Sequence, residues 1–394
     1  MKQISKLAPL AIITAAAIVA LAGCGKKEEA TKAEMKKAAE DVIKIGHVAP
    51  LTGGIAHLGK DNENGARMAV DEINAAGGIK LGEKTFKLEL DAQDDKQDAK
   101  EATIVAQRLV DDGVVAVVGH LNSGMTIPAS KIYADNNVSH ISPSATAVKL
   151  TEQGFKTTFR VVARDDKQGG ALADFAATAL KAKKVAIIDD RSAYGQGLAD
   201  EFEKAIVAKG TVKVVAREFT NDKATDFNAI LTKIRAVKPD VVMYGGMDNT
   251  AAPMAKQMKQ LGIKAPLVAG DGVCTPEFIT LAGDAAGIMS CSQAGEAVDK
   301  LAKGEEFKQK YKAKFGTDVQ IYSPYSYDAV YAIADAIKRA GKPDRVAVTA
   351  ALASSNLPGL TGVIAFDDKG DIKNGAISMF QVKDGKLEYV STQR

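Results

Sequence analysis

The segment VVAVVGHLNSGMTIPAS, residues 114–130, carries the pattern that decides the fold class. Residues 114–118 are all apolar and lead into Gly119, a run typical of a strand buried in a parallel sheet. Small and polar residues follow, and a helix is expected near 128–135. A strand that passes through a short turn into a helix is the repeating unit of a doubly wound α/β sheet.

The same alternation of strands and helices continues on both sides of this segment. Before it, DVIKIGHVA and FKLEL are expected to be strands, with a helix at residues 62–74 between them. The pattern starts again after residues 162–166, with KVAIIDD, VKVVAREF, DVVMYGG and APLVAGD as strands between helices. Three further helices and the strands GVIAFDD, AISMFQVKDG and KLEYV are expected at the end. The sequence therefore predicts an α/β protein with two doubly wound parallel-sheet units.

Length and charge agree with two folded units that do not bind nucleic acid. The chain has 394 residues, whereas a single hydrophobic core stops growing near about 250–300 residues. Lysine and arginine number 52 against 49 acidic residues, and the basic residues are scattered along the chain. No basic patch for nucleic acid is therefore expected.

The N-terminus is typical of an exported protein. Lys2 and Lys6 precede an apolar run at residues 7–21, which is shorter than the roughly 20 residues that span a membrane. Ala-Gly-Cys24 follows, and Leu-Ala-Gly-Cys resembles the lipobox of bacterial lipoproteins. We expect residues 1–23 to be a signal peptide cleaved before Cys24, and Cys24 to carry lipid; ordinary cleavage with an incidental cysteine is the alternative.

Residues 24–40 are charged and rich in alanine, which is typical of a solvated tether. The protein is therefore expected to be exported and lipid-anchored at the cell envelope, on the periplasmic face in a Gram-negative cell. In such an oxidising compartment the remaining cysteines, Cys274 and Cys291, are expected to form a disulfide, with two free thiols as the alternative. The four histidines are scattered, so neither a metal nor a cofactor is expected.

Loops at the carboxyl ends of the expected strands are where a doubly wound sheet binds its ligand. Ser123 lies in such a loop, and three roles compete for it: a nucleophile, part of a phosphate-binding turn, or a hydrogen-bond donor to another anion. Ser123 does not lie in G-x-S-x-G, and neither His120 nor His140 is placed as its base. The chain also lacks G-x-G-x-x-G at the first turn and lacks G-x-x-x-x-G-K-[ST], so nucleotide binding has no support.

A carboxylate suits Ser123 better, because a helix N-terminus presents backbone N–H groups and the serine adds a hydroxyl. Ser144 and Thr146, in SPSAT, supply a second hydroxyl-rich turn, and Asp271 can face an ammonium group. Any one of these hydroxyls alone could instead be a helix N-cap or a local turn. Together with small and apolar neighbours, they predict a site for the zwitterion of an α-amino acid.

The segments GARMAVDEINAAGGI, GHLNSGMTIPASKIY, ISPSATAVKLT, AYGQGLADEF, DVVMYGG and LAGDAAGIMS resemble the leucine/isoleucine/valine-binding proteins. These are substrate-binding components of bacterial ABC transporters, in the type I periplasmic-binding-protein class. The resemblance covers residues 41–394 in order. It implies two α/β lobes joined by three crossovers, with residues 41–163 and 295–366 in the first lobe and residues 164–294 and 367–394 in the second.

The resemblance also implies roles for individual residues. Ser123 and the backbone of Thr146 would hold the ligand carboxylate, while the Ser144 carbonyl and the Thr146 hydroxyl would take the ammonium. Asp271 stands where the family has a glutamate that pairs with the same ammonium. Tyr194 would cover the ligand from the second lobe on closure.

Four more residues are implied around the ligand, three of them near its side chain. Leu121 and Asn122 would border it, and Leu58 stands where relatives often carry an aromatic residue. Met247 stands where a relative has a tyrosine hydroxyl near the carboxylate. These departures from the family pattern leave the precise amino acid open.

The resemblance implies a monomeric solute-binding protein, not an enzyme, that delivers leucine, isoleucine, valine or a similar amino acid to an ABC permease. A protein of the same fold that binds an amide, a urea or an aromatic carboxylate is the alternative, which would leave the Asp271 carboxylate without a cation. A sensory receptor domain would need a membrane span or signalling domain after the binding fold, and the sequence ends at EYVSTQR with neither. An exported hydrolase is a more remote alternative.

Overall fold

The computed structural model describes residues 41–394, which form one compact unit. The expected signal peptide at 1–23, the lipidation at Cys24 and the tether at 24–40 lie outside the described residues. Within residues 41–394, no helix combines the length and the apolar character needed to cross a membrane.

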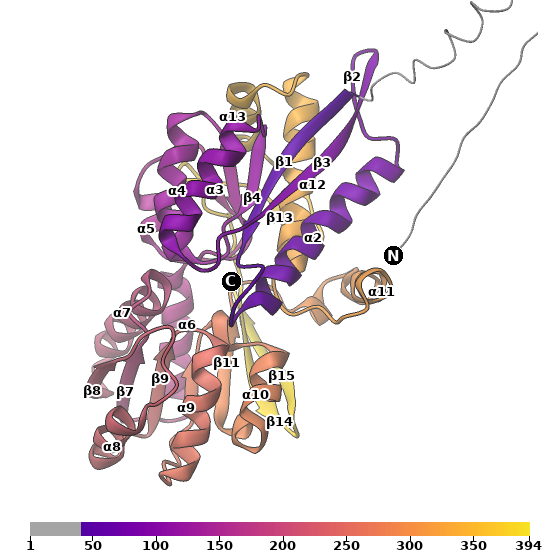
Figure 1. Ribbon diagram of the computed structural model, residues 1–394. Coiled ribbons are helices and arrows are strands. Elements are labelled where there is room, and N and C mark those ends of the chain that lie inside the picture. The colour runs from indigo at the N-terminus through magenta and orange to yellow at the C-terminus, as the bar shows by residue number, and fades with distance from the viewer. Residues whose placement is uncertain (1–40) are drawn as a thin grey trace, which may run out of the picture. The chain divides into compact units, whose positions relative to one another are not determined.

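The first lobe is built on a six-stranded sheet with the order β2-β3-β1-β4-β5-β6 (Figure 1). Every neighbouring pair is parallel except β2 and β3, which form an antiparallel pair at one edge. The strands are β1 (Asp41–Ala49), β2 (Ile79–Leu81), β3 (Lys84–Asp94), β4 (Ala116–Gly119), β5 (Ser139–Ser142) and β6 (Thr158–Arg160).

Helices cover both faces of this sheet, because alternate side chains of each central strand point to opposite sides. Ala116 and Val118 of β4 join one hydrophobic cluster with α2 (Ala56–Ala75) and α12 (Ser323–Ala340). Val117 joins another with α3 (Ala99–Asp111) and α4 (Ser123–Asp135). The remaining helices of this lobe are α5 (Lys149–Glu152), α11 (Gly304–Phe315) and α13 (Arg345–Ala353).

The second lobe is built on a seven-stranded sheet with the order β15-β14-β11-β10-β9-β7-β8. The five strands from β7 to β11 are parallel, and β14 and β15 add an antiparallel edge. The strands are β7 (Lys184–Asp189), β8 (Lys213–Phe219), β9 (Val241–Gly245), β10 (Leu267–Ala269), β11 (Met289–Gln293), β14 (Ile377–Lys383) and β15 (Lys386–Gln393).

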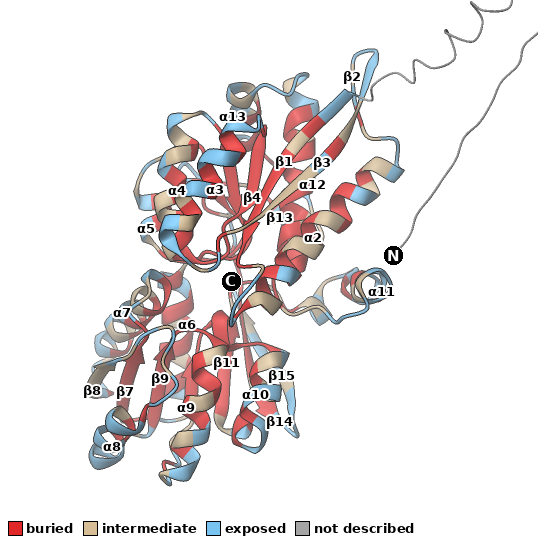
Figure 2. Ribbon diagram, viewed as in Figure 1, coloured by how far each residue is buried: buried red, intermediate tan, exposed pale blue. Residues whose placement is uncertain are grey.

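Helices also cover both faces of the second sheet. Ile187 of β7 packs in the cluster that contains residues of α6 (Asp165–Thr178) and α7 (Ala193–Ala208). Ile188 packs in the cluster of α8 (Asn228–Val237), α9 (Asp248–Gln260) and α10 (Pro276–Ala282). Figure 2 shows the result in both lobes, with buried strands at the centre and exposed residues on the outer faces of the helices.

The chain passes between the two sheets after β6, after β11 and after β13 (Val363–Ile364), which pairs with β12 (Leu357–Pro358). Two of these connections lie side by side, since the backbone N–H of Ala163 donates to the carbonyl of Ala294 over 3.4 Å. The three crossovers agree with the predicted fold class. The exact lobe boundaries remain a prediction.

Several helices begin earlier than their apolar periodicity indicates. The first residues of α4, α6, α7 and α9 are Ser123, Asp165, Ala193 and Asp248. The sequence places these starts three to five residues later, because apolar spacing becomes regular only where a helix packs on its sheet. The first turns of these four helices lie at the carboxyl ends of the strands and contain much of the candidate site.

Candidate ligand-binding site

Ser123 is the first residue of α4 and is 1% exposed. Its hydroxyl oxygen accepts a hydrogen bond from the backbone N–H of Ala147 over 3.2 Å. The hydroxyl proton remains available to a second acceptor. The structure therefore joins the turn after β4 to the turn after β5 through Ser123, and it leaves the donor role predicted for this residue open to a ligand.

The turn after β5 is buried and mostly held by its own hydrogen bonds. The Ser144 hydroxyl donates to the carbonyl of Leu121 over 3.1 Å and accepts from the Asn62 amide over 3.2 Å. Its side chain is thus engaged in the protein, in keeping with a ligand role through its backbone only. The Thr146 hydroxyl, by contrast, is buried with no hydrogen-bond partner among residues 41–394. Such a group calls for a partner, because unpaired buried polar atoms are rare.

Asp271 lies at the end of β10 and receives hydrogen bonds from both lobes. Tyr194 donates from its hydroxyl to Oδ1 over 2.8 Å, and Tyr322 donates to Oδ2 over 2.9 Å. Burial raises the pKa of Asp271, and the two tyrosine hydrogen bonds act in the opposite sense. Tyr194, which was expected to cover the ligand, therefore also positions the carboxylate within its own lobe.

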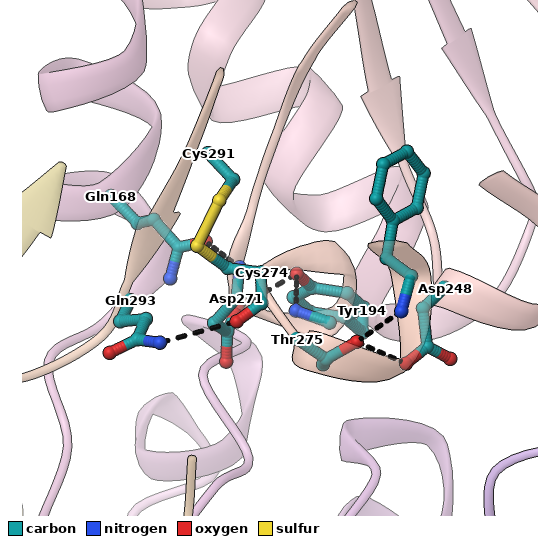
Figure 3. The surroundings of a disulfide bond; sticks show 10 residues. Gln168, Tyr194, Asp248, Asp271, Cys274, Thr275, Cys291 and Gln293 are labelled. Carbon is teal, nitrogen blue, oxygen red and sulfur yellow. Dashed lines mark hydrogen bonds between the residues drawn. A yellow bond between two sulfur atoms is a disulfide. The ribbon is translucent and has the colours of Figure 1, made fainter. Parts of the chain in front are cut away.

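A disulfide lies directly beside this aspartate (Figure 3). Cys274 follows the short 3-10 helix Asp271–Val273, and it is joined to Cys291 of β11. Between Asp271 and Cys274, the backbone N–H of Gly272 donates to the Tyr194 hydroxyl over 3.1 Å. A Cβ at Gly272 would lie 2.9 Å from the backbone carbonyl oxygen of Gly246 and 2.6 Å from the sulfur of Met247, so a larger residue would force a shift here. The cross-link thus holds the turn that carries Asp271 against the sheet.

The predicted apolar residues come together from both lobes. Leu58, Leu121 and Met247 are buried in one hydrophobic cluster that also contains Tyr194 and Tyr322. The Asn122 amide approaches the Met247 sulfur at 4.0 Å, across the two lobes. Asn122 is the N-cap residue of α4, yet its side chain makes no cap hydrogen bond and its Oδ1 is unpartnered within the described residues.

Three further residues belong to this site and were missed from the sequence. Tyr322, just before α12, reaches Asp271 from the first lobe, and the Gln168 side-chain oxygen accepts from the Asp271 backbone N–H over 3.1 Å. Asp165 is fully buried at the start of α6, and neither carboxylate oxygen has a partner in the described part of the chain. Nothing in the sequence separates buried Asp165 from exposed Asp166.

The buried acids give the site its electrostatic character. Burial, followed by the nearby charge of Asp271, raises the pKa of Asp165 well above its usual range. Asp165 lies beside the Thr146 turn, because its backbone N–H donates to the Thr146 carbonyl over 2.9 Å, and its carboxyl group is close enough to Asp271 to feel that charge. A cation next to the two carboxyl groups would relieve both the desolvation and the mutual repulsion. The arrangement can bind a molecule with a positive and a negative group close together.

The histidine next to the serine turn is engaged elsewhere. His120 contacts Asp95 through Nδ1 at 2.9 Å and the Tyr133 hydroxyl through Nε2 at 3.0 Å. Both contacts lie in the buried interior of the first lobe. Within residues 41–394 no group of three or more His, Cys, Asp or Glu side chains is placed to hold a metal ion.

Fold and site together define a class: a two-lobed α/β protein with a polar site at the strand ends of both lobes. The family model described as periplasmic binding protein matches residues 42–386. The chain belongs to this periplasmic binding protein family, in its type I fold.

Several named proteins are similar to the chain. The Leu/Ile/Val-binding protein homolog 1 of Brucella abortus is 38% identical over 89% of this chain and 93% of its own length. A leucine-, isoleucine-, valine-, threonine- and alanine-binding protein of Pseudomonas aeruginosa is 36% identical over 87% of this chain and 90% of its own. Among solved structures, the branched-chain amino acid transporter substrate binding protein LivJ of Streptococcus pneumoniae, in complex with isoleucine, matches with a TM-score of 0.81 at 31% identity. The match covers 90% of this chain and 99% of the LivJ chain.

Proposed function

We propose that this protein captures a branched-chain or similar amino acid between its two lobes and delivers it to an ABC permease. The relatives are solute-binding proteins rather than enzymes, which supports a binding role without catalysis. The proposal includes lobes at residues 41–163 with 295–366 and at 164–294 with 367–394.

The observation that carries this proposal is the pair of buried acids, Asp165 and Asp271, with Asp165 next to the hydroxyl turn at Thr146. Ser123 and Thr146 would bind the ligand carboxylate, and the two acids would face its ammonium group. The cluster of Leu58, Leu121 and Met247 would receive an apolar side chain. A ligand without a cation, such as an amide or an aromatic acid, would leave both buried acids, Asp165 and Asp271, without a positive partner, which is costly.

The proposal extends to the cell envelope. Leu-Ala-Gly-Cys supports cleavage before Cys24 and a lipid anchor at that cysteine, with the charged segment at 24–40 as a tether. The Cys274–Cys291 bond agrees with an oxidising compartment outside the cytoplasm.

Calorimetry with leucine, isoleucine and valine tests the binding function. Asp271→Asn keeps the shape but removes the charge, so affinity should fall by about 2–5 kcal/mol, or roughly thirty- to several-thousand-fold. Ser123→Ala removes one hydroxyl and leaves the backbone donors, so its loss should be smaller, about 1–3 kcal/mol. If Asp271→Asn bound every amino acid as tightly as the unchanged protein, the zwitterion site would be wrong and the amide or acid alternative would replace it.

A further inference from the structure

A hydrogen-bonded pair joins the two lobes next to the candidate site. Nε2 of His57, in the first turn of α2, lies 2.7 Å from Oδ2 of Asp248, the first residue of α9. The two residues are 191 positions apart in the sequence. Each is the immediate neighbour of a residue in the apolar cluster, Leu58 in the first lobe and Met247 in the second. The pair is therefore adjacent in sequence to two residues predicted to contact the ligand, one from each lobe.

The two partners differ in how firmly they are held. The Asp248 side chain is 0% exposed, and its Oδ2 also accepts from the Thr275 hydroxyl over 2.7 Å within the second lobe. Figure 3 shows this contact at the start of α10. The His57 side chain is 21% exposed, and within residues 41–394 its ring has a hydrogen bond to Asp248. Asp248 would keep Thr275 if the lobes parted, whereas His57 would turn to water.

We propose that His57 and Asp248 are a positioning pair that holds the two lobes closed over the bound ligand. The inference rests on the lobe closure in the proposed function, but not on which amino acid is bound. A contact that exists only when the lobes are together favours the closed state by its own free energy.

The strength of this pair depends on pH. Burial by itself lowers the pKa of His57, but the hydrogen bond and charge of Asp248 outweigh it, with smaller contributions from Glu277 of α10 and Asp61 of α2. The net pKa lies above 6.5 in the closed arrangement, so closure takes up a proton. The stabilisation is complete below about pH 6.5, the ordinary value, and is lost as the pH rises through the raised pKa.

The distance between the lobes, measured in ligand-free protein, tests this inference without relying on any ligand. Spin labels at Lys131→Cys of α4 and Thr232→Cys of α8, in a Cys24→Ser background, report that distance while Cys274–Cys291 remains bonded. We expect the closed-to-open ratio to be about threefold to fivefold larger at pH 6 than at pH 8.5, as for a half-buried ion pair. His57→Gln and Asp248→Asn should each abolish the pH dependence, and the double variant should add nothing.

Asp135→Asn is the matched control, because it breaks the exposed Lys131–Asp135 pair within α4 of the first lobe only. This variant is labelled at Gln107→Cys of α3 instead of Lys131→Cys, so that Lys131 and its ion pair are present in the parent protein. The variant should leave the pH dependence of the lobe distance intact. The proposed positioning pair would be wrong if the closed-to-open ratio kept its pH dependence in His57→Gln, or if the ratio did not depend on pH in the parent protein. If the pH dependence behaves as expected but no amino acid binds, the proposed function fails and the positioning pair stands.

Discussion

The two lobes share one architecture but contain different stabilising features. All four histidines, His47, His57, His120 and His140, lie in the first lobe, and all but His57 are fully buried. The second lobe has no histidine and contains the Cys274–Cys291 bond instead. Burial lowers the pKa of His47 and His140 and so disfavours their charged forms, whereas a disulfide does not respond to mild acid. The same fold should therefore be sensitive to protons in one half and to reductants in the other.

Acid should produce the largest difference between the lobes. Burial lowers the pKa of His47 from 6.5 to about 4 and that of His140 to about 3. The folded state then binds fewer protons than the unfolded state, so stability is complete above about pH 6.5 and falls as the pH drops toward 4. The loss is about 3 kcal/mol or more for each histidine. Hydrogen exchange at pH 7 and pH 4.5 should show the first lobe opening before the second.

His47→Leu sharpens this test, since neither ring nitrogen of His47 has a hydrogen-bond partner within residues 41–394. The variant should recover about half of the acid-induced loss, and His57→Gln should recover none of the loss within the first lobe. If the second lobe opened first in acid, the contrast drawn from the histidines would be wrong.

Removing the disulfide should give the next largest effect, in the opposite lobe. The bond closes a loop with a sequence separation of 17, for which the loss of loop entropy corresponds to about 3 kcal/mol. Cys274→Ala with Cys291→Ala should speed hydrogen exchange in the second lobe and leave the first unchanged. Thiol labelling of the unfolded, unreduced parent protein should find neither cysteine free; two labelled thiols would contradict the bond.

The two tyrosines on Asp271 should give the smallest effect and separate stability from binding. Tyr194 and Asp271 belong to one lobe, so Tyr194→Phe should lower the stability of the second lobe by about 1 kcal/mol even without ligand. Tyr322 reaches Asp271 from the first lobe, so Tyr322→Phe should weaken leucine binding by about tenfold with little change in stability. Calorimetry and thermal unfolding of both variants measure this, and equal effects of the two on stability would remove the distinction.

The sequence by itself determined the repeating architecture and the residues at the strand ends. Apolar runs such as 114–118, which overlaps β4, are typical of buried strands, and the turns after such strands meet at one edge of a parallel sheet. This is why Ser123, Thr146 and Asp271 could be named in advance. The pattern missed β11, because MSCSQ has no apolar run, and it placed the starts of several helices too late.

Only the tertiary structure decided which of these side chains remain available and what joins the lobes. Asp165 and Asp166 look alike in the sequence, but packing buries the first without a partner and exposes the second. The contacts of Tyr322 with Asp271 and of His57 with Asp248 span 51 and 191 residues. No local pattern records such separations, because they arise when two independently patterned sheets are brought together by three crossovers.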